Sequence, residues 1–527
     1  MVPNFQDMSD PLKDSKYQRS SLLLIGAVLL FRLLYAAIFP VNPVGDEAYY
    51  WDWGRQLDYG YYSKPPLIAW LYAFVDWIGG GSLYAIRATA GVTGCLSLLV
   101  LFRLTTAQFG AKTGWYSIVI GLAIPANSVL GYLLTIDAPL TLCWSIALWM
   151  LWRYLSGTKP GQSLFFLFLA LGIGHLSKQM MMVFPVLTVV LLAVQSDTRS
   201  YLKRPALWAT LLLSYLSLLP PLIWNAQNHW ITFKHTSHHF ESVSGGGNII
   251  LERLEDFAEF IGSQLGVLSP VFGVVLYIIC IGRLKTIRTA SLAVRFALVF
   301  GGIPLVGMLF MAMRQGLQPN WPAVFYLSCM PLVAAFFSGA VEFAKPSAAT
   351  RERLLKNGLI IGFALSAFFY FGSPVMKLAG IQGHKADPNR RLMGYDKLAE
   401  GFEEVRRQQT DADELFIVAL GHRDTTSQLA FALPDQPKVY RWSSHSGIES
   451  QYEMWNNPFE DGFEGKDGFI LVPGNNKFPG PLSDVFESYK KVGEFEAVFG
   501  YDRTKFYTVY RGKTLHGWPE SNELANP

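Results

Sequence analysis

The sequence predicts a mainly α polytopic membrane helical bundle with a small C-terminal α/β domain outside the cytoplasm. First, 51% of the 527 residues are hydrophobic and only 16% are charged, whereas soluble proteins carry about 25% charged residues. Second, long uncharged apolar runs recur as far as residue 375. Third, residues 376–527 are charged and polar, as in a soluble domain.

The apolar runs predict about eleven membrane spans, because a helix needs roughly 17–25 apolar residues to cross a bilayer. The predicted spans are 21–40, 83–102, 113–134, 136–152, 163–176, 177–195, 206–224, 264–281, 292–313, 322–341 and 357–375. One long bent helix over 163–195 is an alternative, and it would invert the sidedness of everything that follows. The first run lacks a small-residue cleavage site after it, so we interpret it as a retained span rather than a signal peptide.

The basic residues predict which segments face the cytoplasm, since inner loops are rich in Lys and Arg. With residues 1–20 as a cytoplasmic tail, successive inner segments contain Lys13, Lys16 and Arg19; Arg103 and Lys112; Arg153 and Lys159; Arg199, Lys203 and Arg204; Arg283, Lys285 and Arg288; and Lys345, Arg351, Arg353 and Lys356. The stretches 41–82 and 225–263 and the domain 376–527 then lie outside. Residues 21–375 form the transmembrane domain.

The C-terminal domain shows the alternation of strand-type and helix-type segments. LFIVAL (415–420), GFILV (468–472) and KFYTVY (505–510) are typical of strands, and LAFAL (429–433) resembles a short helix. The four cysteines lie in apolar runs without metal or disulfide spacing. A net charge of +4 is too small to indicate nucleic-acid binding.

Residues that could take part in catalysis or ligand binding are densest in the first outer segment, 41–82. These residues begin with Asp46 and Glu47, continue with aromatic residues that include Tyr49 and Tyr50, and end at Tyr62-Ser63-Lys64-Pro65-Pro66. Acids beside a span end can simply be solvated. Here, however, the aromatic run suits the water–lipid interface, and the prolines hold a lysine in a stiff turn. Because adjacent side chains point in different directions, one acid should face the site and the other should support it.

Further polar residues fall at other outer span ends. Asp137 suits either a functional acid or a helix N-cap with Pro139 just inside the helix, and both remain open. Lys178 could reach lipid headgroups or meet a lipid phosphate. Arg32 lies inside the first span and requires a partner, an acid or a phosphate, whereas Arg87 is expected at the interface.

Two later segments also place polar and aromatic residues on the outer side of the membrane. His235, His238 and His239 have a spacing that suits a metal, but no cysteine or carboxylate accompanies them. An amphipathic interfacial segment with Trp230, Phe233 and Phe240 is therefore the favoured interpretation, and no metal site is predicted. Asn320 and Trp321 begin another span, as a rigid helix start or a sugar-contacting surface.

Almost every notable polar group is thus predicted at the outer surface of the membrane. Residues 45–71, GDEAYYWDWGRQLDYGYYSKPPLIAWL, resemble the first outer loop of GT-C superfamily membrane glycosyltransferases. The nearest branch is family 39/83-like: protein O-mannosyltransferases, aminoarabinose transferases that modify lipid A, and lipopolysaccharide galacturonosyltransferases. Further matches follow in order: TIDAPL (135–140), GHLSKQMMMVFP (174–185), PPLIWNAQNHWITFKH (220–235), QPNWPA (318–323) and HRDTTSQLAFALPDQPKVY (422–440).

The resemblance implies a catalytic base at Asp46 with Glu47 beside it, a second acid at Asp137, and donor phosphate binding by Lys64 and Lys178. Many relatives have an acid where this chain has Ser63, so the role of that acid is not carried over to this chain. Aromatic residues would stack on sugars, and we assign substrate binding to Tyr49, Tyr50, Tyr62, Asn320 and Trp321.

The expected reaction is an inverting transfer of a sugar from a polyprenyl-phosphate donor to a lipid, polysaccharide or protein acceptor. It is expected on the extracytoplasmic side of the bacterial inner membrane. No cofactor is expected; a divalent cation could join the acids and phosphate, but the lysines make it unnecessary. A secondary transporter of an anionic or polar solute is the alternative, and it predicts midplane charges and an internal repeat. A non-catalytic scaffold is a second rival, disfavoured by the many ionisable groups at span ends.

Overall fold

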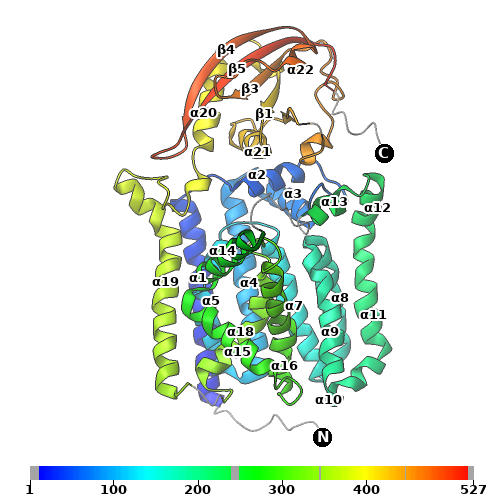
Figure 1. Ribbon diagram of the computed structural model, residues 1–527, viewed down its shortest axis with the longest axis vertical. Coiled ribbons are helices and arrows are strands. Elements are labelled where there is room, and N and C mark those ends of the chain that lie inside the picture. The colour runs from blue at the N-terminus through cyan, green and yellow to red at the C-terminus, as the bar shows by residue number, and fades with distance from the viewer. Residues whose placement is uncertain (1–10, 239–248, 343–345, 446, 520–527) are drawn as a thin grey trace. The chain divides into compact units, whose positions relative to one another are not determined.

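The computed structural model describes residues 11–238, 249–342, 346–445 and 447–519. These residues form two compact units (Figure 1). The helical unit comprises residues up to 38, 64–67 and 87–369, and the sheet unit comprises residues 39–63, 68–86 and the chain from 370 onward. The first outer segment, 41–82 by sequence, therefore belongs largely with the C-terminal sheet.

Most of the long helices follow the predicted apolar runs, but α14 (Ile249–Leu268) lies mostly in 225–263, the stretch predicted as an outer loop. Every predicted span falls on one or more of these elements. They are α1 (Pro11–Ile38), α4 (Leu83–Phe109), α5 (Ala111–Leu122), α6 (Pro125–Leu130), α7 (Asp137–Leu155), α8 (Pro160–Ser177), η1 (Gln179–Met182), α9 (Val183–Val194), α10 (Ser196–Arg199), η2 (Ser200–Lys203), α11 (Pro205–Leu213), η3 (Ser214–Leu218), α12 (Leu219–Gln227), α13 (Ile231–His238), α14 (Ile249–Leu268), α15 (Pro270–Leu284), α16 (Leu292–Ala297), η4 (Leu298–Gly302), α17 (Ile303–Ala312), α18 (Ala323–Ser338) and α19 (Ala348–Leu378).

By length and composition, 6 of the described helices could cross a membrane, or up to 8 if each bent pair is one span. The predicted span 113–134 is shorter than expected because Pro125 cannot donate a backbone hydrogen bond, so the chain divides into α5 and α6. The predicted division of 163–195 into two elements is confirmed. α8 ends at Ser177, and Lys178 adopts an extended backbone (φ −157°, ψ 140°) before η1 and α9.

The core of the helical unit is built around Trp144 on α7. Its ring is fully buried and meets Phe184 of α9 and Phe325 of α18 edge-on, at 5.0 and 5.8 Å between centroids. The indole nitrogen donates to Oγ of Ser328 at 2.8 Å, which satisfies the polar atom of a buried tryptophan. This packing holds α7, α9 and α18 together.

Two arginines of this unit have backbone partners. Arg32 is buried, and its Nη2 donates to the Asn127 carbonyl at 2.9 Å. A Cβ at Gly131 would lie 2.1 Å from Cζ of Arg32, so the glycine admits the guanidinium. Arg87 is also buried, donates to the Tyr132 carbonyl and lies 4.5 Å above the Tyr132 ring. Each of the two guanidinium groups thus donates to a backbone carbonyl within the helical unit. The interfacial placement of Arg87 stays a prediction.

The sheet unit contains a five-stranded sheet in the order β2-β1-β3-β5-β4. β1 pairs in parallel with β2 and β3, while β5 runs antiparallel to β3 and β4. The elements are α20 (Tyr395–Arg407), β1 (Phe416–Leu420), α21 (Arg423–Ala432), β2 (Val439–Trp442), η7 (Gln451–Glu453), β3 (Gly468–Pro473), α22 (Gly480–Ser483), β4 (Phe486–Val498) and β5 (Thr504–Leu515), with short 3-10 turns η5 (Arg390–Leu392) and η6 (Ala412–Glu414). The three predicted strands and the predicted helix are confirmed.

Both faces of this sheet are covered, which explains the continuous apolar run of β1. On one face Phe469 of β3 meets Phe402 of α20, with 5.8 Å between ring centroids. On the other face Phe416 and Ile470 join a core cluster that extends to Phe486. Figure 1 shows α20 and α21 beside the sheet in this unit.

The first outer segment completes the sheet unit with α2 (Gly45–Gly54) and α3 (Leu67–Gly79). α2 packs against α21: the rings of Trp51 and Phe431 meet edge-on at 5.0 Å, and Gln428 Nε2 donates to the Pro43 carbonyl at 2.6 Å. A Cβ at Gly45 would lie 2.5 Å from the carboxyl carbon of Asp424. Glycine at this position therefore lets the two helices approach closely.

Candidate active site

Asp46 lies in the first turn of α2, where the helix dipole favours a negative charge. Its Oδ1 accepts a hydrogen bond from Nη2 of Arg423 at 3.0 Å. The carboxylate of Asp46 keeps 47% of its surface exposed, against 28% for Arg423. Asp46 is thus held in place and still accessible to a substrate.

Glu47, predicted to assist Asp46, points elsewhere. It is fully buried, and its Oε2 accepts a hydrogen bond from the backbone N–H of Val44 at 3.0 Å. This bond satisfies a backbone donor at the start of α2, as in a capping box. The two adjacent acids therefore differ in their surroundings: Asp46 is accessible, and Glu47 is buried and bonded to the start of α2. Their roles in a site stay a prediction.

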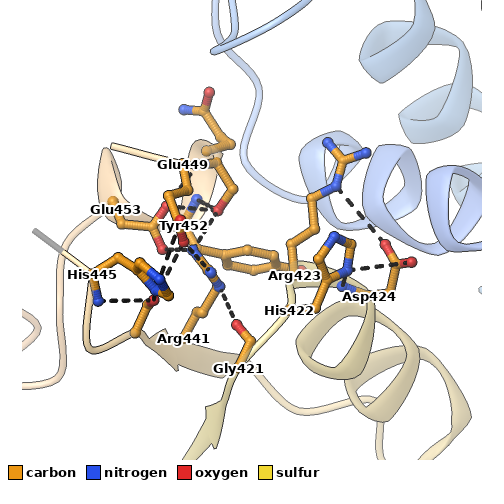
Figure 2. A network of polar contacts seen from close by, with 12 residues as sticks. Gly421, His422, Arg423, Asp424, Arg441, His445, Glu449, Tyr452 and Glu453 are labelled. Carbon is orange, nitrogen blue, oxygen red and sulfur yellow. Dashed lines mark hydrogen bonds and ion pairs between the residues drawn. The ribbon is translucent and has the colours of Figure 1, made fainter. Parts of the chain in front are cut away.

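Arg423 begins α21 and is held from several sides. Its guanidinium carbon lies 4.6 Å above the Tyr49 ring, a cation–π contact that fixes the side chain. Figure 2 shows Arg423 beside His422 and Asp424; His422 Nδ1 accepts from the backbone N–H of Asp424. Burial alone would raise the pKa of Asp424, but the hydrogen bond and charge of His422, with Arg423, bring this pKa below its usual value.

The predicted substrate-binding tyrosines of this segment are buried. Tyr49 is fully enclosed, its hydroxyl accepts from the backbone N–H of Gln451 at 2.5 Å, and burial raises its pKa. Tyr50 and Tyr62 are 2% and 8% exposed. The backbone N–H of Tyr62 donates to Oε1 of Gln451 at 2.7 Å. The side chain of Tyr49 joins α2 to the C-terminal part of this unit through Gln451 and Arg423. Substrate contact by Tyr49, Tyr50 and Tyr62 stays a prediction.

Sequence reasoning missed Asp52, Arg423 and Tyr452. Tyr452 donates its hydroxyl to Oδ2 of Asp52 at 2.7 Å, and Arg55 reaches Oδ1 of Asp52 at 3.3 Å. Burial raises the pKa of Asp52, with Arg55 and the hydrogen bond from Tyr452 acting in the opposite direction. The available signals were an acid inside the aromatic run at 48–53 and a charged pair at 423–424 in the C-terminal domain.

The helical unit brings together a second cluster, which contains Asp137, Lys178 and Asn320. Lys178 Nζ donates to Oδ1 of Asp137 at 2.8 Å, and Asn320 Nδ2 donates to Oδ2 at 2.6 Å. Only 4% of the Asp137 side chain and 12% of the Lys178 side chain are exposed. Three separate segments thus converge on one buried carboxylate, while the neighbouring Trp321 packs against the helical core.

The N-cap interpretation of Asp137 is wrong. The N-cap of α7 is Ile136, and no side chain caps this end. Asp137 is instead the first residue of the helix, and its carboxylate turns to the cation of Lys178. A buried charge that would otherwise be costly is compensated by this ion pair.

Lys64 lies between buried neighbours and is itself half-buried. It belongs to the helical unit, whereas Asp46 belongs to the sheet unit. Their action on one substrate remains a prediction.

The histidine segment gathers no metal-binding group within the described residues. His235 and His238 lie on α13, and His239 and Phe240 lie outside the described residues. Throughout the described parts of the chain, no three His, Cys, Asp or Glu side chains are grouped to hold a metal. Trp230 and Phe233 are about half exposed at 48% and 51%.

Comparison with known proteins places this geometry in context. Residues 63–224 match a family model described as dolichyl-phosphate-mannose-protein mannosyltransferase. The crystal structure of ArnT from Cupriavidus metallidurans in the apo state superposes over 93% of this chain and 98% of that one, with a TM-score of 0.59 and 15% identity. The chain has the GT-C fold. The predicted fold class is confirmed, and so is the predicted resemblance to GT-C proteins.

Two further proteins are similar to this chain. The chain is 27% identical over 255 residues to lipid A galacturonosyltransferase RgtD of Rhizobium johnstonii, covering 48% of this chain and 52% of the relative. It therefore aligns with about half the length of that relative. An apo oligosaccharyltransferase from Archaeoglobus fulgidus has a TM-score of 0.50 at 10% identity, over 88% of this chain and 70% of that one. The GT-C fold and the apolar helices make this chain a multi-pass membrane protein.

Proposed function

We propose that the chain is a glycosyltransferase that moves a sugar from a polyprenyl-phosphate donor to an acceptor outside the cytoplasm. The observation that carries this proposal is Asp46: an accessible carboxylate held by Arg423, within a GT-C fold. The family match and the relative RgtD support the same chemistry. The names of the matched proteins lend no support to the transporter alternative.

Asp46 is the base in this mechanism. It takes the proton of an acceptor hydroxyl as that oxygen attacks the anomeric carbon of the donor. A single attack with phosphate as leaving group inverts the anomeric configuration. In this proposal Glu47 is not the base but supports the start of α2, since it is buried and accepts a hydrogen bond from the backbone N–H of Val44.

Lysines stabilise the departing phosphate in this proposal. Lys64, in its stiff Pro-Pro segment, neutralises the charge that grows as the glycosidic bond breaks. Lys178 is held by Asp137, and Asp137 is shared with Asn320. The pair presents an ammonium whose position is fixed by a carboxylate, which suits binding of a phosphate oxygen. One ArnT structure is described as bound to undecaprenyl phosphate, which agrees with a donor of this class.

For the acceptor we propose a lipopolysaccharide component, because the relative RgtD is named as a lipid A galacturonosyltransferase. The basic residues of the predicted inner loops support a cytoplasmic N-terminus and an outer C-terminal domain in the inner membrane.

The test is product release. Purified full-length protein is incubated with lipid A and with polyprenyl phosphates that carry radiolabelled galacturonic acid, aminoarabinose or mannose. A transferase liberates polyprenyl phosphate and labels the acceptor, and omission of lipid A gives the hydrolysis background. Mass spectrometry of envelope glycolipids from cells with and without the protein gives an independent measurement. Absence of any donor turnover and of any glycolipid difference would rule the proposal out.

A further inference from the structure

A pocket of about 780 Å³ lies along β2 in the sheet unit. This volume falls within the roughly 300–1,000 Å³ range of small-molecule sites. The pocket continues past Trp442, the last residue of β2, to Ser443 and Ser444. Ligands of α/β sheets commonly bind at the carboxyl ends of the parallel strands.

Aromatic rings form much of the pocket wall: Trp442, Trp455 and Trp518 all line it. Trp442 and Trp518 are anchored against the core cluster of the sheet, and Trp455 meets the ring of Tyr452 edge-on at 5.4 Å. Within the described part of the chain, no hydrogen bond engages the indole N–H of these three residues. The wall therefore combines flat apolar surfaces with indole donors not used by described residues.

Two neutral amides stand beside these rings. Asn456 Nδ2 donates to Oδ1 of Asp461 at 3.1 Å, and Asn457 Oδ1 accepts from the backbone N–H of Glu460 at 3.1 Å. Each amide is thus fixed at one end. Oδ1 of Asn456 and Nδ2 of Asn457 have no partner among the described residues. One acceptor and one donor therefore remain for a ligand.

The charges of the pocket are compensated internally. Arg441 pairs with both Glu449 and Glu453 (Figure 2), and only 5% of its side chain is exposed. The hydrogen bond from Arg441 lowers the pKa of Glu449, so this carboxylate stays ionised. Lys438 pairs with Asp461 in the same way. Both cations among the described lining residues, Lys438 and Arg441, are thus paired with carboxylates, and Glu453 and Glu460 also line the pocket. An anionic ligand would therefore find no unpaired Lys or Arg side chain among these described residues.

We propose that this pocket binds an uncharged saccharide. The tryptophan rings provide surfaces for the apolar faces of sugar rings, while the indole N–H groups, amides and serine hydroxyls bond to sugar hydroxyls. Tyr452 links the pocket to α2, because its side chain lines the pocket and its hydroxyl donates to Asp52. The binding proposal does not depend on the transferase proposal.

The experiment measures binding of saccharides to the full-length protein in lipid nanodiscs, since maltoside detergents would compete for the pocket. An array of uncharged, acidic and amino-sugar oligosaccharides is probed, and hits are titrated by calorimetry. We expect uncharged oligosaccharides to bind and acidic ones to bind at least about tenfold more weakly. No binding of any uncharged oligosaccharide, or a preference for charged ones, would overturn the proposal.

Variants assign the binding to this pocket. Trp455→Ala should weaken binding about tenfold or more, whereas Trp455→Phe should restore most of it because an aromatic surface remains. Trp77→Ala is the control, since Trp77 is 81% exposed on α3 and does not line the pocket. Glu449→Gln should improve binding of acidic saccharides by removing one counter-charge of Arg441. Equal affinities for Trp455→Ala and the unmodified protein would refute the assignment.

Discussion

The Nη2 atom of Arg423 lies 3.0 Å from Oδ1 of Asp46, although 377 residues separate the two positions. The C-terminal domain therefore contributes directly to the environment of the proposed base. If Asp46 is that base, Asp46→Asn should lower kcat by about 10²–10⁴-fold, the usual contribution of a general base. Radiolabel transfer from a polyprenyl-phosphate sugar measures the effect.

The control for this change is Glu47→Gln, which retains an oxygen able to accept from Val44. We expect near-normal turnover from Glu47→Gln and similar Tm values for both variants. Retained turnover in Asp46→Asn would exclude Asp46 as the base.

Lys64→Ala should weaken transfer by removing a cation from the donor phosphate. We expect a higher KM for the donor, a lower kcat, or both, because phosphate binding and leaving-group stabilisation share one charge. Steady-state kinetics with varied donor concentration measures this effect. The exposed Lys477 gives a matched control, Lys477→Ala. Unchanged kcat and KM in Lys64→Ala would argue against any phosphate role.

Removing one member of the Asp137–Lys178 pair should destabilise the folded protein more than removing both charges. Lys178→Met leaves a buried carboxylate with Asn320 as its remaining described partner, and the loss of one member of a buried pair costs about 3–5 kcal/mol. The double variant Asp137→Asn/Lys178→Met should recover most of the lost Tm because no unpaired charge remains. Thermal unfolding followed by tryptophan fluorescence in nanodiscs tests this order. A double variant less stable than Lys178→Met would contradict it.

Asp52→Asn should change how stability depends on pH. Burial raises the pKa of Asp52 above its unfolded value, so the folded state retains the proton over a pH range where the unfolded state has lost it. The stability contributed by this group is therefore present below the unfolded pKa and is lost as pH rises through the folded pKa. Asn cannot titrate, so the decline of Tm with rising pH should be shallower in Asp52→Asn. Exposed Glu487 offers the control Glu487→Gln, and identical pH profiles for Asp52→Asn and the unmodified protein would disprove this account.

Gly45→Ala tests the close approach of α2 and α21. The added Cβ would lie 2.5 Å from the carboxyl carbon of Asp424, so the Asp424 side chain, which pairs with His422 and Arg423, or one of the two helices must shift. Overpacking of this kind costs about 1–3 kcal/mol, and we expect a lower Tm together with reduced turnover. In the control Gly480→Ala, nothing lies within 4 Å of the new Cβ. Equal Tm values for the two variants would contradict the steric argument.

Most of the long apolar helices could be predicted because hydrophobic length is a local property of the sequence, whereas α14, which carries several charged residues, was missed. The predicted strands in 415–420, 468–472 and 505–510 were similarly clear, since buried strands are continuous apolar runs. β4 was missed because its residues are mostly charged or polar, as is common at a sheet edge. β2 was missed because it has only 4 residues.

The contacts of the site were harder to foresee. The sequence pointed to Asp46, Asp137 and Lys178 as separate outer residues, but spacing alone cannot show that Lys178 meets Asp137 or that Arg423 meets Asp46. These pairs form through tertiary packing between distant segments. The capping interpretation of Asp137 failed for the same reason, because a local helix-start pattern also fits a residue that is paired with another helix.

The composite origin of the sheet unit has a consequence for biosynthesis. Residues 39–63 leave the ribosome long before η7 and α21, which they contact in the finished unit. The aromatic residues of α2 therefore have no contact with these partners until the C-terminal part of the chain has been translated. A premature stop codon before residue 423 would leave this segment without its native cover, and quality-control proteases should then recognise the fragment.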